Sequence, residues 1–119
     1  MSKIHDAVAR VRRLPSVRGV VVLTNDGLVA ATALEADQSS DVIAGLASYL
    51  LMTTNRSLGE GALGKCSQLV MHATNGKAVL VDLGESFLVV LFDQFAEIGP
   101  AQAGIDEAAA SMRAASQLG

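Results

Sequence analysis

Tight turns separate several short apolar segments of this chain and limit the folds that it can adopt. Asn25-Asp26-Gly27 and Asn75-Gly76 are of the kind that tolerates the positive φ angles of a hairpin turn. Gly84-Glu85-Ser86 is a third short turn. Because such turns join neighbouring strands that run in opposite directions, we predict antiparallel pairing. The predicted strands are residues 17–24, 28–33, 68–74, 77–83 and 87–93.

The remaining segments have the apolar periodicity that is typical of helices. Apolar residues recur at helical spacing over residues 3–14, and Pro15 ends that helix. A long middle helix begins after an N-cap at Ser39 or Ser40 and runs to about residue 58. Ile98-Gly99-Pro100 breaks the chain before a last helix. The predicted order is α-β-β-α-β-β-β-α, an α+β sandwich in one domain over residues 1–119, with helices packed on a five-stranded antiparallel sheet.

The last helix carries its apolar residues on one side, and acidic residues lie near its N-terminus. The residues that we expect it to bury are Ile105, Ala108, Ala109, Met112 and Ala115.

Composition narrows the class of protein. Half of the 119 residues are apolar and the mean hydropathy is +0.39, which is more apolar surface than one small domain can hide, so we expect an oligomer. The single cysteine excludes a disulfide framework and is typical of a reducing, cytoplasmic setting. The polar N-terminus is unlike a signal peptide, and the longest strongly apolar run, residues 87–92, is too short to insert directly into a membrane.

Charge argues against nucleic-acid binding. The net charge is −3, and four aromatic residues offer few platforms on which bases could stack. Residues 1–18 are an exception, because they carry five basic residues and one acidic residue. This basic segment could contact an anionic partner, or it could simply form a solvated helix face.

The middle helix has two sides without charge when it is drawn on a helical wheel. One side, which we expect to lie on the sheet, gathers Ile43, Leu46, Ala47 and Leu50. The opposite side carries Ala44, Ser48, Leu51, Met52 and Asn55, with Gly45 and Tyr49 at its margin. A helix that is apolar or small on both sides is buried on both sides. The second side could be covered by the other helices of the chain or could pair with a second copy across a two-fold axis, which we favour.

The segment 68–74 supports the pairing of two copies. It has no Lys, Glu, Asp or Pro to discourage another strand from adding to it. If it lies at the edge of the sheet, its residues, including Leu69, Met71 and His72, face a second copy.

A search for chemical motifs identifies no catalytic, cofactor or metal site. Residues 59–66 contain the spacing of a phosphate-binding loop, but a helix precedes them and a strand follows, the reverse of what such a loop needs. We interpret Cys66 as a packing residue and His72 as an interface or partly buried residue. Asp82 and Glu85 are interpreted as polar turn residues. The residues therefore indicate a binding module and not an enzyme.

The order of elements and several segments resemble the roadblock/dynein light-chain family, which is profilin-like in fold. The resemblance rests on residues 20–31, the long middle helix and its glycine-rich exit. Residues 87–93, followed by Ile98-Gly99 and an alanine-rich helix, are most similar to the bacterial gliding-polarity regulators of the MglB type.

This resemblance implies a homodimer that is joined through the middle helix and the third strand. It also implies a partner, a small Ras-like GTPase in its GTP-bound form, whose hydrolysis the dimer accelerates by reordering the switch regions. The alternatives are a non-catalytic adaptor in a motor or signalling complex and a small-ligand sensor. The expected dimer and partner interface is Asp41, Ala44, Gly45, Ser48, Tyr49, Leu51, Met52, Asn55, Leu69, Met71 and His72.

Overall fold

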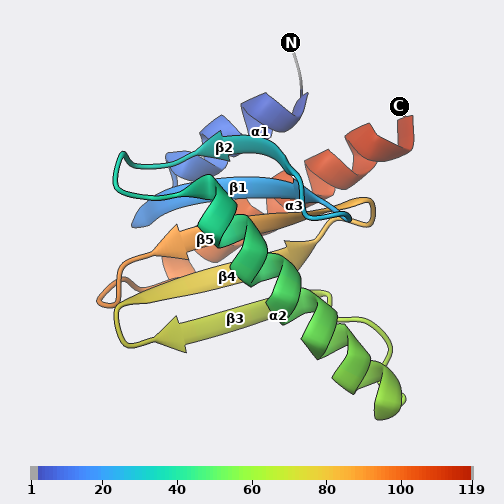
Figure 1. The fold of residues 1–119 in the computed structure, drawn as a ribbon. Coiled ribbons are helices and arrows are strands. Elements are labelled where there is room, and N and C mark those ends of the chain that lie inside the picture. The colour runs from blue at the N-terminus through green and yellow to red at the C-terminus, as the bar shows by residue number, and fades with distance from the viewer. Residues whose placement is uncertain (1–2, 119) are drawn as a thin grey trace.

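The computed structural model describes residues 3–118 and contains every predicted element (Figure 1). The helices are α1 (Lys3–Arg12), α2 (Ser40–Glu60) and α3 (Gly99–Leu118). The strands are β1 (Val17–Thr24), β2 (Val29–Ala33), β3 (Gln68–Ala73), β4 (Gly76–Asp82) and β5 (Ser86–Phe92). The α+β order expected from the sequence is therefore confirmed.

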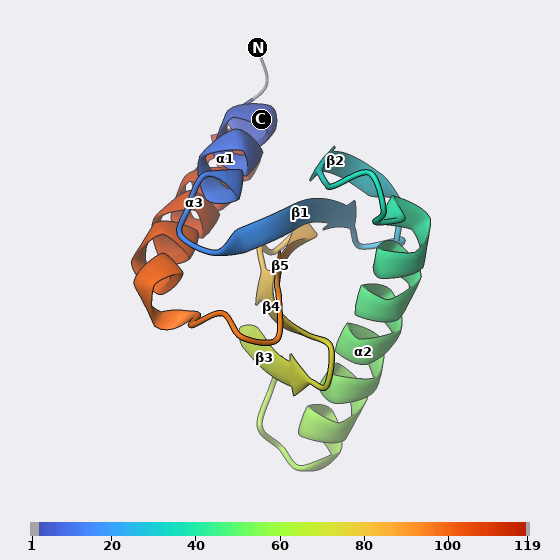
Figure 2. The same cartoon turned by 90° about the vertical axis from the view of Figure 1, so that its left-hand side faces the viewer.

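The five strands form one antiparallel sheet in the order β2-β1-β5-β4-β3. Figure 2 shows three layers, with α1 and α3 on one face of the sheet and α2 on the other. Each face has its own apolar core, because alternate residues of a strand point to opposite faces. Residues such as Val20 and Val90 pack towards α1 and α3, and Val21 and Val89 pack towards α2.

The start of α3 differs from the prediction. Gly99 is its first residue and Pro100 lies in its first turn, so the segment that we expected to interrupt the chain opens the helix instead. Proline is tolerated there because the first turn of a helix has no internal partner for its N–H groups. The buried face of α3 is as predicted for Ile105, Ala108, Ala109 and Met112, whereas Ala115 is only half-buried.

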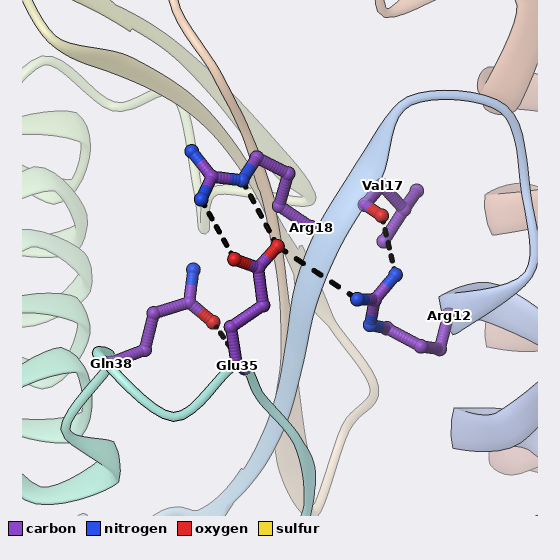
Figure 3. A network of polar contacts seen from close by, with 5 residues as sticks. All are labelled: Arg12, Val17, Arg18, Glu35 and Gln38. Atoms are coloured by element: carbon purple, nitrogen blue, oxygen red, sulfur yellow. Dashed lines mark hydrogen bonds and ion pairs between the residues drawn. The ribbon is translucent and has the colours of Figure 1, made fainter.

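A network around Glu35 fixes the connection between β2 and α2 (Figure 3). Arg18 donates from Nε and Nη2 to the two carboxylate oxygens of Glu35 at 3.0 and 2.7 Å. Arg12 Nη2 lies 3.8 Å from Glu35 Oε1, and Arg12 Nη1 donates to the carbonyl oxygen of Val17 at 2.7 Å. The backbone N–H of Glu35 donates to Gln38 Oε1 at 2.8 Å. Arg10 Nη2 also donates to Ser111 Oγ at 3.5 Å, so three of the five basic residues near the N-terminus make internal contacts.

Candidate protein-interaction surface

The helix α2 is the most distinctive element of the surface. It begins after Ser39, whose Oγ accepts a hydrogen bond from the N–H of Val42 at 3.3 Å, and Asp41 lies favourably in the first turn. The helix crosses the sheet diagonally, and its C-terminal end extends past β3 (Figures 1 and 2). One long helix therefore reaches from the β1–β2 side of the molecule beyond the opposite edge of the sheet.

The side of α2 that faces the sheet differs from the wheel prediction. Ala44, Ala47 and Leu51 are buried against the sheet, and Ile43 and Leu50 are half-buried beside them. The predicted outward position of Ala44 and Leu51 is therefore wrong. Both have almost no surface left to offer a partner. The wheel was ambiguous because small and apolar residues occupy both sides of this helix.

Four large apolar side chains of α2 point away from the sheet. They are Val42, Leu46, Tyr49 and Met52, which are 61%, 61%, 63% and 56% exposed. Leu46 was expected on the sheet, so that prediction is wrong as well. Gly45 lies among them, and a methyl group added there would meet nothing within 4 Å. An exposed apolar patch that surrounds an open glycine is typical of an interaction site.

This exposed face continues into a shallow groove on each side of α2. The first, which we call the β3-side flank, is an apolar groove of about 70 Å³. Residues of α2 line it together with residues of β3, β4 and β5, and these include Leu46, Leu50, Met71 and Leu80. It lies next to the edge of the sheet that β3 forms.

The second groove, which we call the hairpin-side flank, has a volume of about 510 Å³. Its α2 residues include Gly45, Ser48, Tyr49 and Met52, and none of its lining residues belongs to the β3-side flank. Asn25 and Asp26 of the turn between β1 and β2 form the opposite wall. Gly27 brings this turn close to α2, because a Cβ at Gly27 would lie 3.1 Å from Ser48 Oγ. No sequence pattern indicates this wall, since Asn25 and Asp26 are distant from α2 along the chain.

The strand β3 lies at an edge of the sheet, as its predicted pairing with a second copy requires. Its six residues pair in register with β4 without a bulge. Leu69 and Met71 are half-buried and point towards α2, whereas Val70 and His72 are exposed, so His72 is not partly buried as the alternative had it. The other edge, β2, has five residues and an irregular register opposite Val22 and Leu23. A bulge discourages further pairing, so β3 is the more open edge.

Asn55 has a structural role that the sequence did not indicate. Its Oδ1 accepts a hydrogen bond from the N–H of Cys66 at 2.7 Å, which ties the end of the glycine-rich loop to α2. Cys66 is buried, as its interpretation as a packing residue requires. The loop follows α2 and leads into β3, so the predicted order of helix, loop and strand is confirmed.

The predicted interface residues that keep accessible surface lie in separate parts of the molecule. Gly45, Ser48, Tyr49, Met52 and Asn55 line the hairpin-side flank, and Asp41 is exposed near the N-terminus of α2. Leu69, Met71 and His72 lie on β3. No cluster of three or more His, Cys, Asp or Glu that could hold a metal ion occurs within residues 3–118, and no helix in this range could cross a membrane.

Comparison with known proteins identifies the family. Residues 3–92 match the Roadblock/LC7 domain, and the chain belongs to that family. The fold is similar to that of Myxococcus xanthus MglB, with a TM-score of 0.88 at 15% identity over 96% of this chain and 94% of that one. A Roadblock/LC7 domain from Streptomyces avermitilis superimposes with a TM-score of 0.82 at 24% identity, over 95% and 97% of the two chains.

Among relatives by sequence, an uncharacterised protein of Methanocaldococcus jannaschii is 29% identical over 113 residues. The match covers 95% of this chain and 96% of the relative. The similarity therefore extends over nearly the whole chain.

Proposed function

We propose that the protein is a homodimeric regulator of a small Ras-like GTPase. The observation that carries this proposal is the exposed apolar face of α2 beside the open edge strand β3. Membership of the Roadblock/LC7 family and the similarity of the fold to MglB support it. The two flanks of α2 are separate surfaces, so one flank can form the dimer while the other binds the GTPase.

In the proposed dimer, β3 pairs with β3 of a second copy, and the β3-side flanks of the two α2 helices cover each other. A two-fold interface must be self-complementary, and an uncharged strand next to an apolar groove meets that requirement. Leu46 and Leu50 then become buried together with Leu69 and Met71. The sheet continues across both copies.

The hairpin-side flank is the surface that we assign to the GTPase. It lies on the side of α2 away from β3, so the dimer leaves it accessible. Tyr49 and Met52 provide large exposed side chains, which are typical anchors of protein interfaces. Gly45 allows the backbone of a partner to approach closely.

The proposed mechanism needs no catalytic residue from this chain. A dimer that binds the hydrolysis-competent arrangement of the switch regions more tightly than other arrangements increases its population. The GTPase then performs the hydrolysis with its own residues and its magnesium ion. We accordingly propose that the protein itself is not an enzyme.

The test is a capture experiment on extract of the source cells. The immobilised protein is incubated with a non-hydrolysable GTP analogue in one sample and with GDP in the other. The proposal predicts that a small GTPase is retained with the GTP analogue and that the protein accelerates its GTP hydrolysis. Retention of a partner equally in both samples, without effect on hydrolysis, would instead identify an adaptor.

A matched pair of variants locates the partner surface. Met52→Asp places a charge in the hairpin-side flank and should abolish the capture. Leu63→Asp changes a side chain that is 73% exposed in the glycine-rich loop and should leave capture unchanged. If Met52→Asp captured the GTPase as well as Leu63→Asp does, the GTPase would bind elsewhere.

A further inference from the structure

A further cavity lies away from both flanks of α2, at the end of the sheet where β4 turns into β5. It has a volume of about 530 Å³, within the range of small-molecule sites, which is about 300–1,000 Å³. Three segments that are distant in the sequence form it: the chain just before β3, the β4–β5 turn, and α3. We call it the turn-end cavity, and its principal lining residues are Lys65, Cys66, Asp82, Leu83, Glu85 and Arg113.

The charges around this cavity are balanced but not paired with one another. Lys65 and Arg113 supply two positive charges, and Asp82 and Glu85 supply two negative ones. Among the residues that the structure describes, ion pairs form only between Glu35 and the arginines Arg12 and Arg18. The four charged side chains of the turn-end cavity therefore lie around one space without neutralising each other directly.

Two of these side chains are held in place by hydrogen bonds. Arg113 donates from Nε and Nη2 to the backbone oxygen of Asp82 at 3.2 and 2.8 Å, which orients the guanidinium and leaves Nη1 for another acceptor. Asp82 Oδ1 accepts from the N–H of Gly84 at 2.7 Å. Gly84 has a φ of +92°, a conformation that favours glycine. Cys66 and Leu83 are buried and add an apolar part to the wall.

We propose that the turn-end cavity binds a small aminocarboxylate, such as a free α-amino acid. Its carboxylate would bind Arg113 and Lys65, since guanidinium and ammonium groups are strong donors to carboxylates. Its ammonium group would bind the carboxylates of Asp82 and Glu85. A simple anion would be repelled by the two acids and a simple cation by the two bases, so the charge pattern favours a ligand that carries both charges. This inference does not depend on the proposed GTPase partner.

The test is isothermal titration calorimetry of the full chain with each common L-amino acid. We expect at least one of them to bind. Its N-acetyl and carboxamide derivatives, which each lack one charge, should bind at least about tenfold more weakly, because each leaves charged groups of the site unpaired. Absence of binding by every amino acid at about 10 mM, or equal binding of the derivatives, would overturn the proposal.

Variants at exposed positions connect the binding to this cavity. Lys65→Gln and Glu85→Gln each remove one charge from the wall and should each weaken binding about tenfold. Lys3→Gln and Glu97→Gln make the same chemical changes at exposed positions outside the cavity and should leave binding unchanged. Binding that both cavity variants retain in full would exclude the turn-end cavity as the site. Thermal melting of every variant, recorded alongside, shows that it is folded.

Discussion

Glu35 is the residue that connects the basic N-terminal segment to the start of α2. Its pKa is lowered mainly by the hydrogen bonds from Arg18, and the positive charges of Arg18 and Arg12 add to this effect while desolvation opposes it. The same interaction raises the pKa of Arg18. A carboxylate whose pKa is lower in the folded than in the unfolded chain stabilises the fold when it is ionised. That contribution is complete above the ordinary pKa of glutamate and disappears as the pH falls through the lowered one.

Glu35→Gln is therefore expected to lower the melting temperature at about pH 7, where the carboxylate of the wild-type protein is charged. The difference between the two proteins should narrow below about pH 4.3, the ordinary pKa of glutamate, and close at more acidic pH. Thermal melts followed by circular dichroism across this range measure the effect. A difference that stays constant with pH would show that the charge of Glu35 does not contribute.

Glu97→Gln is the control for this series. Glu97 is exposed and forms no ion pair among the described residues. Surface carboxylates of this kind contribute little to stability. The melting temperature of this variant should follow that of the wild-type protein at every pH.

At the scale of single elements, the sequence predicted where α2 lies but not how it is rotated. Its N-cap and length follow from local chemistry, which the sequence contains in full. Its rotation depends on the sheet beneath it, on which Ala44 and Leu51 pack while Leu46 stays exposed. Periodicity alone could not decide this, because both sides of the wheel are apolar or small.

Substitution of the exposed glycine in α2 should have opposite effects on the stability of the helix and on binding at the interface. Gly45 lies inside a helix with open space around it, so Gly45→Ala should raise the free energy of unfolding by about 0.5–1 kcal/mol. The same methyl group should weaken capture of the GTPase, because the partner's backbone approaches at this point in our proposal. Urea denaturation and the capture experiment measure the two effects.

Gly59→Ala is the matched control for Gly45→Ala. Gly59 also lies in α2 with nothing within 4 Å of a Cβ, but it is near the C-terminal end and outside the hairpin-side flank. This variant should gain a similar or smaller amount of stability, since helix ends fray, and should retain full capture. Undiminished capture by Gly45→Ala would mean that the closest contact with the partner lies elsewhere on α2.

At the scale of the whole molecule, local turns determined which strands are hairpin partners. They did not determine the pairing of β1 with β5, which joins segments more than sixty residues apart and places β5 at the centre of the sheet. The turn-end cavity was also beyond prediction, because Arg113 reaches the β4–β5 turn only when α3 packs on the sheet. Asp82 and Glu85 were visible as turn residues, whereas the proximity of Lys65 and Arg113 was not.

The proposed assembly predicts different outcomes for charges placed on the two flanks of α2. Leu46→Asp puts a carboxylate in the β3-side flank, and the two-fold axis places two of them in each dimer. Burial of unpaired charges costs several kcal/mol, so the dissociation constant of the dimer should rise at least about a hundredfold. Leu46 is exposed in the single chain, so the fold itself should persist. Analytical ultracentrifugation should find this variant monomeric at concentrations at which the wild-type protein is dimeric.

Met52→Asp introduces the same charge on the hairpin-side flank and should remain dimeric while it loses the GTPase. Phe95→Asp serves as a control for both, because Phe95 is 87% exposed on the loop between β5 and α3, outside both flanks of α2. It should sediment and capture the GTPase like the wild-type protein. If Met52→Asp gave monomers and Leu46→Asp stayed dimeric, the assignment of the two flanks would have to be exchanged. If both stayed dimeric, the copies would have to meet without the outward face of α2, since a charge on either flank would then be compatible with association.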